Sequence, residues 1–175
     1  MDTGRLKGKL FSNRTKTYCV LDGAAIDGLP KALYEHDPLH ECLMRGDLGP
    51  DMIHVAPYVS FMIEDDKFTN WVFEHALGRN AVIFINTRFS ITEMRNHLRS
   101  LMTVHDEDGN PMLFRFYDPR VFRKFLPTCD SGQLETFFGK IDAFFVESED
   151  GTELIRYRIH EGSLEIEEQE KSEDS

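Results

Sequence analysis

Three charged side chains stand close together in residues 112–120, which read Met-Leu-Phe-Arg-Phe-Tyr-Asp-Pro-Arg. The spacing of Arg115, Asp118 and Arg120 lets two guanidinium groups meet one carboxylate. Pairs of this kind form two parallel hydrogen bonds and typically fix a structural corner. The end of a strand is also where α/β proteins place binding and catalytic residues. We favour the structural interpretation, because an aspartate with two arginines and no nearby nucleophile has no evident reaction to catalyse.

The same stretch predicts the elements that position these residues. Residues 112–117 place alternate side chains on two faces with a period of two, which is typical of a strand. Asp118 is a favoured helix N-cap, and Pro119 suits the first helical position, where no backbone donor is needed. We therefore expect a strand that passes directly into a helix, with no loop between them.

The remaining pattern predicts one α/β domain, with α+β as the alternative, in which helices flank a mixed sheet. Residues 81–85 are a continuous apolar strand, and Ser90 and Glu93 form a capping box that starts the next helix, so a βαβ unit or a close relative of it is expected. Residues 53–63 are apolar and β-rich, with a bend at Pro57. Gly109 and Gly151 each follow an aspartate and predict two β-hairpins in the second half.

Charge divides the chain into three parts. The 175 residues carry a net charge of −11, which argues against a nucleic-acid-binding protein. Residues 1–17 are a basic segment with no clear element, and residues 18–160 are the expected α/β domain. Residues 161–175 are acidic, and we expect a disordered tail there.

Cysteine usage and hydropathy predict the compartment. The three cysteines have no paired spacing, which favours a reducing compartment and argues against a disulfide framework. The first residues lack the apolar core of a signal peptide, and no apolar run reaches membrane-spanning length. We expect a cytoplasmic protein.

Recognisable catalytic motifs are missing, so we expect a protein that is not an enzyme and needs no cofactor or metal. The chain has no glycine-rich phosphate loop, nucleophile elbow, paired-histidine helix motif or CxxC. His36 and His40 are separated by a proline, and the acidic residues 106–108 lack the calcium-loop pattern. The alternative is a hydrolase that uses His75 or His97 with Asp118, although a histidine on an apolar helix face is typically bonded to a backbone carbonyl.

Seven short blocks resemble the bacterial type VI secretion effector adaptor family, and they occur in matching order from about residue 18 to residue 146. The blocks are Val20-Leu21-Asp22-Gly23-Ala24, Ala56-Pro57-Tyr58-Val59, Gly78-Arg79, His97-Leu98-Arg99, Leu113-Phe114-Arg115-Phe116-Tyr117-Asp118-Pro119-Arg120-Val121, Phe125-Leu126-Pro127 and Phe137-Phe138-Gly139.

The resemblance implies a non-catalytic adaptor chaperone. Such a protein holds a toxic effector and helps to load it onto a VgrG-type spike, so the implied partners are these two proteins, with no nucleic acid and no membrane. An immunity-like binding protein of the same system is the alternative. Many family members carry a variable lobe after the shared domain, whereas only a hairpin and an acidic segment follow it here. The candidate partner-facing or site-organising residues are Arg79, Arg115, Tyr117, Asp118 and Arg120.

Overall fold

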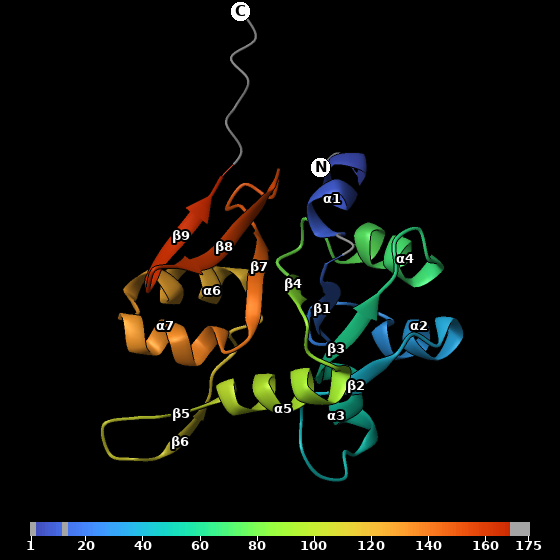
Figure 1. The fold of residues 1–175 in the computed structure, drawn as a ribbon. Helices are drawn as coiled ribbons and strands as arrows, with labels where there is room; N and C mark the ends of the chain where they lie inside the picture. Colours follow the sequence, from blue (N-terminus) through green and yellow to red (C-terminus); the bar gives the residue numbers. More distant parts are fainter. Residues whose placement is uncertain (1–2, 12–13, 169–175) are drawn as a thin grey trace, which may run out of the picture.

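The computed structural model describes residues 3–11 and 14–168, which form a seven-stranded sheet with helices on both faces (Figure 1). The strand order is β2-β3-β1-β4-β7-β8-β9, and every neighbouring pair in it is antiparallel. The strands are β1 Lys16–Asp22, β2 His40–Cys42, β3 Pro57–Met62, β4 Val82–Thr87, β7 Ile141–Glu147, β8 Leu154–His160 and β9 Ser163–Glu167.

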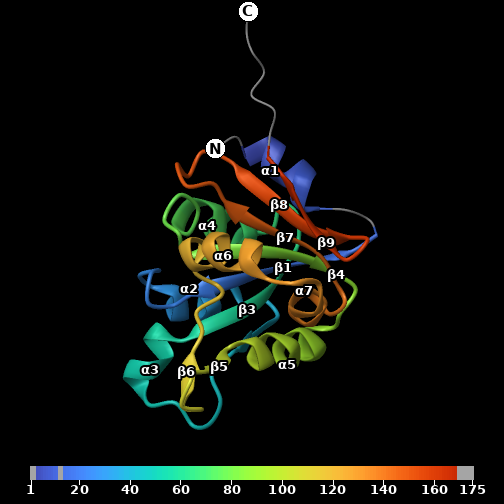
Figure 2. The ribbon, with the colours of Figure 1, turned by 90° about the vertical axis from the view of Figure 1, so that its left-hand side faces the viewer.

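Seven α-helices lie within the described residues, and a separate two-stranded hairpin extends from them (Figures 1 and 2). The helices are α1 Thr3–Leu10, α2 Leu29–His36, α3 Pro50–Val55, α4 Lys67–His75, α5 Ile91–Leu101, α6 Pro119–Phe125 and α7 Ser131–Phe138. The hairpin consists of β5 Thr103–His105 and β6 Pro111–Leu113. No helix in this part of the chain is long and apolar enough to cross a membrane.

The central strands have two buried faces, which explains their continuous apolar runs. In β4, Phe84 packs into one hydrophobic core, while its neighbours Ile83 and Ile85 pack into a second core. Successive side chains of a strand point to opposite faces, so a strand covered on both sides needs apolar residues throughout. The apolar strand predicted at residues 81–85 is confirmed, and it lies between β1 and β7.

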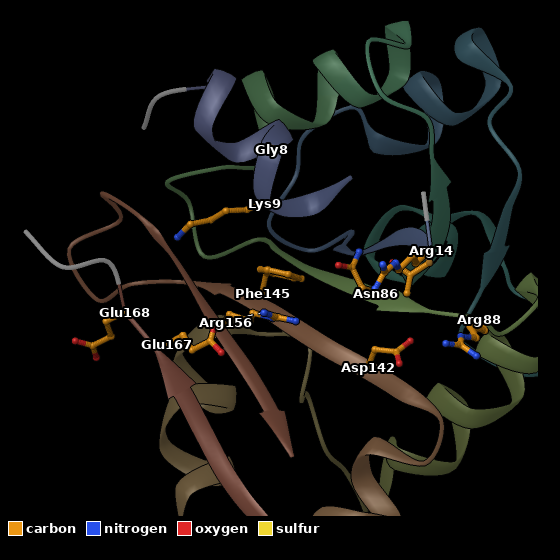
Figure 3. A pocket seen from close by; sticks show the side chains of 11 residues that line it. Gly8, Lys9, Arg14, Asn86, Arg88, Asp142, Phe145, Arg156, Glu167 and Glu168 are labelled. Atoms are coloured by element: carbon orange, nitrogen blue, oxygen red, sulfur yellow. Dashed lines mark hydrogen bonds and ion pairs between the residues drawn. The ribbon is translucent and has the colours of Figure 1, made fainter. Parts of the chain in front are cut away.

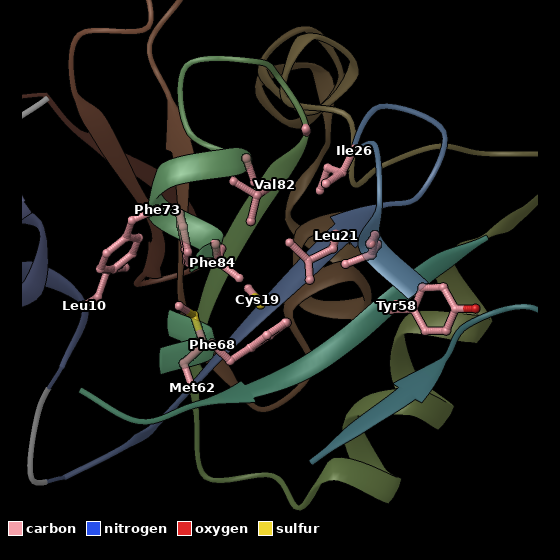
Figure 4. Packing of buried hydrophobic residues seen from close by; sticks show 14 of the residues in the cluster. Leu10, Cys19, Leu21, Ile26, Tyr58, Met62, Phe68, Phe73, Val82 and Phe84 are labelled. Atoms are coloured by element: carbon pink, nitrogen blue, oxygen red, sulfur yellow. The ribbon is translucent and has the colours of Figure 1, made fainter. Parts of the chain in front are cut away.

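The two cores lie under different helices. The first core takes side chains from α1, α2 and α4, and Figure 4 shows Leu21, Phe68 and Val82 gathered in it. The second core takes Met94 and Leu98 from α5 together with side chains of α6 and α7. Both cores share the strands of one sheet, so the described residues form a single domain, as predicted.

The sheet itself differs from the predicted mixed sheet with a βαβ unit. After β4 and α5, the next strand is β5, which pairs only with β6 in the hairpin. The chain returns to the main sheet at β7, which runs antiparallel to β4. The local pattern of strand, helix and strand was correct, but it does not determine which strands pair.

The strand predicted at residues 112–117 is wrong beyond Leu113. Phe116 and Tyr117 are consecutive, yet both are buried in the second core, which the alternation of a strand does not allow. The chain therefore turns, and the Asp118 amide donates to the Arg115 carbonyl at 3.0 Å. A turn thus separates β6 from α6, although the predicted N-cap at Asp118 and Pro119 in the first helical turn are confirmed.

The β-rich segment predicted at residues 53–63 is a helix followed by a strand. Pro50 stands in the first turn of α3, where a proline costs no hydrogen bond. The Tyr58 hydroxyl donates to the Ile53 carbonyl at 3.0 Å and ties α3 to the following strand. Pro57 opens β3, as its lack of a backbone donor requires.

The basic N-terminal segment contains an element that the sequence pattern did not predict. Within residues 1–17, α1 buries Leu6 and Leu10 in the first core, and β1 begins at Lys16. Two leucines four residues apart lie on one helix face, which is enough to anchor a short helix to a sheet.

The acidic C-terminal segment is not structureless throughout, because β9 occupies Ser163–Glu167. Its acidic side chains are neutralised by β8: Arg158 pairs with Glu165 at 2.7 Å and with Glu167 at 3.0 Å. Cross-strand pairs of opposite charge favour this pairing. The rest of the predicted disordered tail, residues 169–175, lies outside the described residues.

Candidate functional site

Asp22 and Arg115 form the first half of a charged corner at the surface. Asp22 ends β1, and its buried carboxylate, 2% exposed, accepts a hydrogen bond from Arg115 Nη2 through Oδ2. The other oxygen, Oδ1, accepts from the Ala24 amide at 3.1 Å. Burial opposes the charge on Arg115, but the neighbouring Asp22 carboxylate raises the pKa of Arg115 above its ordinary value. The Arg115 side chain is 43% exposed, so it contacts the buried acid and also reaches solvent.

Asp118 and Arg120 form the second half at the start of α6. Asp118 Oδ1 accepts from the Arg120 amide at 2.9 Å and from Arg120 Nε at 3.0 Å. Its Oδ2 accepts from Arg120 Nη2 at 2.8 Å, which completes a bidentate pair. Burial disfavours the charged form of Asp118, but the bonds from Arg120 outweigh it and lower the pKa of Asp118. One carboxylate therefore caps the helix and also orients the Arg120 side chain, which is 64% exposed.

The two pairs belong to one electrostatic group. The charge of Arg115 acts on Asp118 as well as on Asp22, and the charge of Asp22 acts on Arg120. Both carboxylates are buried and both guanidinium groups reach solvent. We call these four residues the arginine corner. Its geometry presents two fixed cationic donors outward over two buried acids.

Tyr117 is buried beside the arginine corner and contacts Arg115. Its ring is buried, stands edge-on to Phe116 with centroids 5.6 Å apart, and lies 5.8 Å from the Arg115 guanidinium carbon. Burial, reinforced by the nearby Asp22 charge, raises the pKa of Tyr117, so its hydroxyl stays protonated at neutral pH. Tyr117 thus contacts Arg115 through a side-chain hydrogen bond and through its aromatic ring.

Arg79 lies apart from the arginine corner in the bonding pattern. It is exposed in the turn after α4, and among the described residues no hydrogen bond or ion pair joins its side chain to the corner. That turn is held by the buried carboxylate of Glu147, which accepts from the amides of Gly78 at 2.9 Å and Asn80 at 3.2 Å. Burial raises the pKa of Glu147 despite these bonds. The structure therefore brings together four of the five predicted site residues.

The histidines considered for a hydrolase have other partners. His75 Nδ1 lies 2.9 Å from the Trp71 carbonyl, which confirms the predicted bond to a backbone carbonyl. His97 Nε2 lies 2.8 Å from the carbonyl of Phe137. Both oxygens of Asp118 accept from Arg120. The carboxylate is held as an anchor for a cation, and neither histidine is bonded to it among the residues that the structure covers.

The acidic tip of the β5–β6 hairpin has a structural use. The Asp106 carboxylate accepts from the Asp108 amide at 3.0 Å and from the Asn110 amide at 2.7 Å, so it closes the turn. Within residues 3–11 and 14–168, no three histidine, cysteine or acidic side chains are grouped to hold a metal ion. Cys19, Cys42 and Cys129 are free thiols.

A charged cleft of about 600 Å³ lies between the end of α1 and the strands β7 to β9 (Figure 3). Two of its cations contact an acid or a carbonyl: Lys9 Nζ donates to the Leu154 carbonyl at 3.1 Å, and Arg156 Nη1 pairs with Glu167 at 3.3 Å. Asp142 points into the same space (Figure 3). Charges of both signs line the cleft, so it selects neither an anionic nor a cationic ligand.

Comparison with known protein families identifies the family of this chain. A family model described as "Domain of unknown function (DUF4123)" matches residues 17–136, which is more than half of the chain. The chain belongs to the DUF4123 family. No curated protein and no solved structure matches it. The DUF4123 match contains all four residues of the arginine corner, from Asp22 on β1 to Arg120 on α6.

Asp22 is the corner residue that sequence reasoning left out of the candidate site. It stands 93 residues before Arg115, and only the fold brings the two together. A weak signal was present, because an aspartate that ends a buried apolar strand must find a donor.

Proposed function

We propose that this DUF4123 protein is a non-catalytic adaptor that binds a type VI secretion effector and assists its loading onto a VgrG-type spike. The ordered sequence blocks that resemble the effector adaptor family support the proposal, and the longest of them forms part of the arginine corner. The observation that carries it is the pair of outward guanidinium groups, each held by a buried aspartate.

This geometry suits protein recognition. Arginine is enriched at the centres of protein interfaces, where its planar fork binds carboxylates and carbonyls. Asp22 and Asp118 already fix the positions of Arg115 and Arg120, so less side-chain entropy is lost when a partner binds. The carboxylate oxygens of the two aspartates accept hydrogen bonds from these arginines and from backbone amides. The aspartates therefore act as a scaffold and not as a general base.

Coexpression tests the proposal directly. A tagged copy is expressed with the effector and the VgrG-type spike encoded beside its gene, then captured and run on a size-exclusion column. We expect a stable complex and an effector that is less soluble without this protein. Elution of this protein alone, with both candidates folded, would contradict the proposal.

Arginine variants test the part that the corner plays in the complex. Arg120→Ala removes the more exposed guanidinium while the capping bond to the Arg120 amide remains. Arg158→Ala on β8 is the matched control, because that arginine is also partly exposed and ion-paired. We expect only Arg120→Ala to weaken capture. A killing assay separates the immunity alternative, since an immunity protein neutralises the toxin.

A further inference from the structure

Helix α3 buries none of its side chains. Met52, Ile53 and Val55 are all exposed although they are large and apolar. A surface helix normally places its apolar side chains against the core, so three exposed apolar side chains on one short helix make it a candidate interaction site. The helix is nevertheless held in place, because its Ile53 carbonyl accepts from the Tyr58 hydroxyl at 3.0 Å.

The β5–β6 hairpin shows the same feature. Each residue of β6 is exposed, including Met112 and Leu113. A two-stranded hairpin is only marginally stable by itself, and this one buries no side chain of β6 in the domain. In both views α3 and the hairpin lie at the same lower end of the molecule (Figures 1 and 2).

The arginine corner connects these two elements. A Cβ atom on Gly23 would lie 2.3 Å from the Ala56 carbonyl oxygen and 3.0 Å from the Val55 carbonyl carbon, so the residue after Asp22 touches the end of α3. Asp22 in turn binds Arg115, which stands two residues after Leu113 of β6. The chain that follows Asp22 therefore contacts the end of α3, and the chain that precedes Arg115 is the exposed strand β6.

We propose that α3, β6 and the arginine corner form one docking surface for a protein segment that carries an aspartate or glutamate between apolar side chains. The apolar residues of the segment cover Val55 and Leu113, and its carboxylate binds Arg115 and Arg120. This inference rests on the proposed adaptor function and adds to it the surface and the chemistry of the partner.

Charge complementarity selects this occupant. Arg120 donates Nε and Nη2 to Asp118, whereas Arg115 donates Nη2 to Asp22 and also hydrogen-bonds to Tyr117. Both side chains remain open to solvent, at 43% and 64% exposure. A partner carboxylate would meet donors that are already oriented. A second copy of this chain fits less well, because a two-fold contact through the surface brings two pairs of arginines face to face.

Substitutions at exposed positions test the surface without disturbing the core. Val55→Glu and Leu113→Glu place a like charge against the expected carboxylate and remove apolar contact. Ile63→Glu is the matched control, because Ile63 is 59% exposed, close to the 56% of Leu113, and follows the opposite end of β3 from α3. The probes are the effector and the VgrG-type spike. Each is coexpressed and purified with the wild-type protein, and its binding is then titrated by calorimetry. Circular dichroism confirms that each variant is folded.

We expect Val55→Glu and Leu113→Glu to raise the dissociation constant at least about tenfold, while Ile63→Glu changes it less than about twofold. We also expect binding to weaken with added salt, and Arg120→Gln to reduce that dependence. Equal binding by all variants would overturn the docking surface and leave the adaptor function standing. Failure of the wild type to bind either probe would overturn the function itself. If the free protein dimerises and Leu113→Glu abolishes the dimer, the surface binds a second copy of this chain and the proposed acidic segment is overturned as its occupant.

Discussion

At the arginine corner, the acidic side chains are buried and the basic side chains reach solvent. Asp22 and Asp118 are 2% and 6% exposed, whereas their arginine partners reach solvent. Removing one member of a buried pair costs more than the pair contributes, because the remaining charge stays desolvated. The corner is therefore most sensitive to loss of an arginine, which leaves a buried carboxylate unpaired, and each arginine has both a structural task and an exposed surface.

Replacing Arg115 with alanine separates these two tasks. The Asp22 carboxylate then loses its cation, and we expect the free energy of unfolding to fall by about 1–3 kcal/mol in urea titrations. This is less than the ~3–5 kcal/mol for a wholly buried pair, because water screens the partly exposed Arg115. A stable variant that has lost partner binding would instead assign Arg115 to recognition.

A double variant checks the cause of that loss. Asp22→Asn combined with Arg115→Ala removes the buried charge along with its partner, and we expect it to recover part of the lost stability. The asparagine introduced by this substitution can still accept from the Ala24 amide through its side-chain oxygen, as Asp22 does. Simple addition of the two single effects would show that the two side chains are not coupled.

Stability at acid pH should report on Asp118. The bonds from Arg120 hold the pKa of Asp118 below that of an unfolded aspartate, about 3.9. The ionised Asp118 carboxylate therefore stabilises the folded state fully above the pKa of the unfolded state. This stabilisation is lost as the pH falls through the lower pKa of the folded state. We expect the difference in unfolding free energy between the wild type and Asp118→Asn to shrink across this window. A constant difference from pH 5 to 2.5, a range chosen to bracket about 3.9, would contradict the assignment.

Among the elements, α1 shows how a short polar segment becomes part of a domain. Leu10 is fully buried, and its carbonyl accepts from Thr17 Oγ1 at 2.7 Å and from Asn86 Nδ2 at 2.8 Å. These bonds tie the end of α1 to β1 and β4. The helix is thus an integral layer of the first core and not an appendage.

Substitution of Leu10 with alanine measures that role. We expect the free energy of unfolding to drop by about 2–5 kcal/mol, the usual cost of a cavity left by a buried leucine. Gly8→Ala is the matched control on the same helix, because a Cβ atom there meets nothing within 4 Å. It should stabilise slightly through helix propensity. If Leu10→Ala lowers the free energy of unfolding by less than about 0.5 kcal/mol, α1 is an appendage and not part of the core.

In the whole molecule, both cores depend on one sheet. The side chains of β1, β4 and β7 alternate between the first and the second core. Loosening either core therefore disturbs strands that the other one needs. We expect the domain to unfold in a single step.

Trp71 provides a probe on one side of the sheet. It is the single tryptophan and packs against the first core, stacked on His75 with centroids 4.6 Å apart. Phe122→Ala opens the second core, and we expect Trp71 fluorescence and far-ultraviolet circular dichroism to shift together in urea. Separate transitions for the two signals would show that the cores unfold independently.

The features that the sequence alone determined depend on interactions between residues close together in the chain. The caps at Asp118 and Ser90, and the turn at Asp108-Gly109, depend on bonds between residues at most a few positions apart. The continuous apolar run of β4 likewise required a strand buried on both faces. Such features follow from side-chain type and spacing, because the interacting groups are neighbours in the chain.

Only the tertiary structure decided the direction of the sheet, the turn after β6 and the partner of Arg115. Phe116 and Tyr117 break the strand alternation because the second core takes both rings. Asp22 reaches Arg115 across 93 residues of sequence, and the exposure of α3 follows from what the other helices leave uncovered. These outcomes depend on which distant segments pack together, and no local pattern of residues encodes that choice.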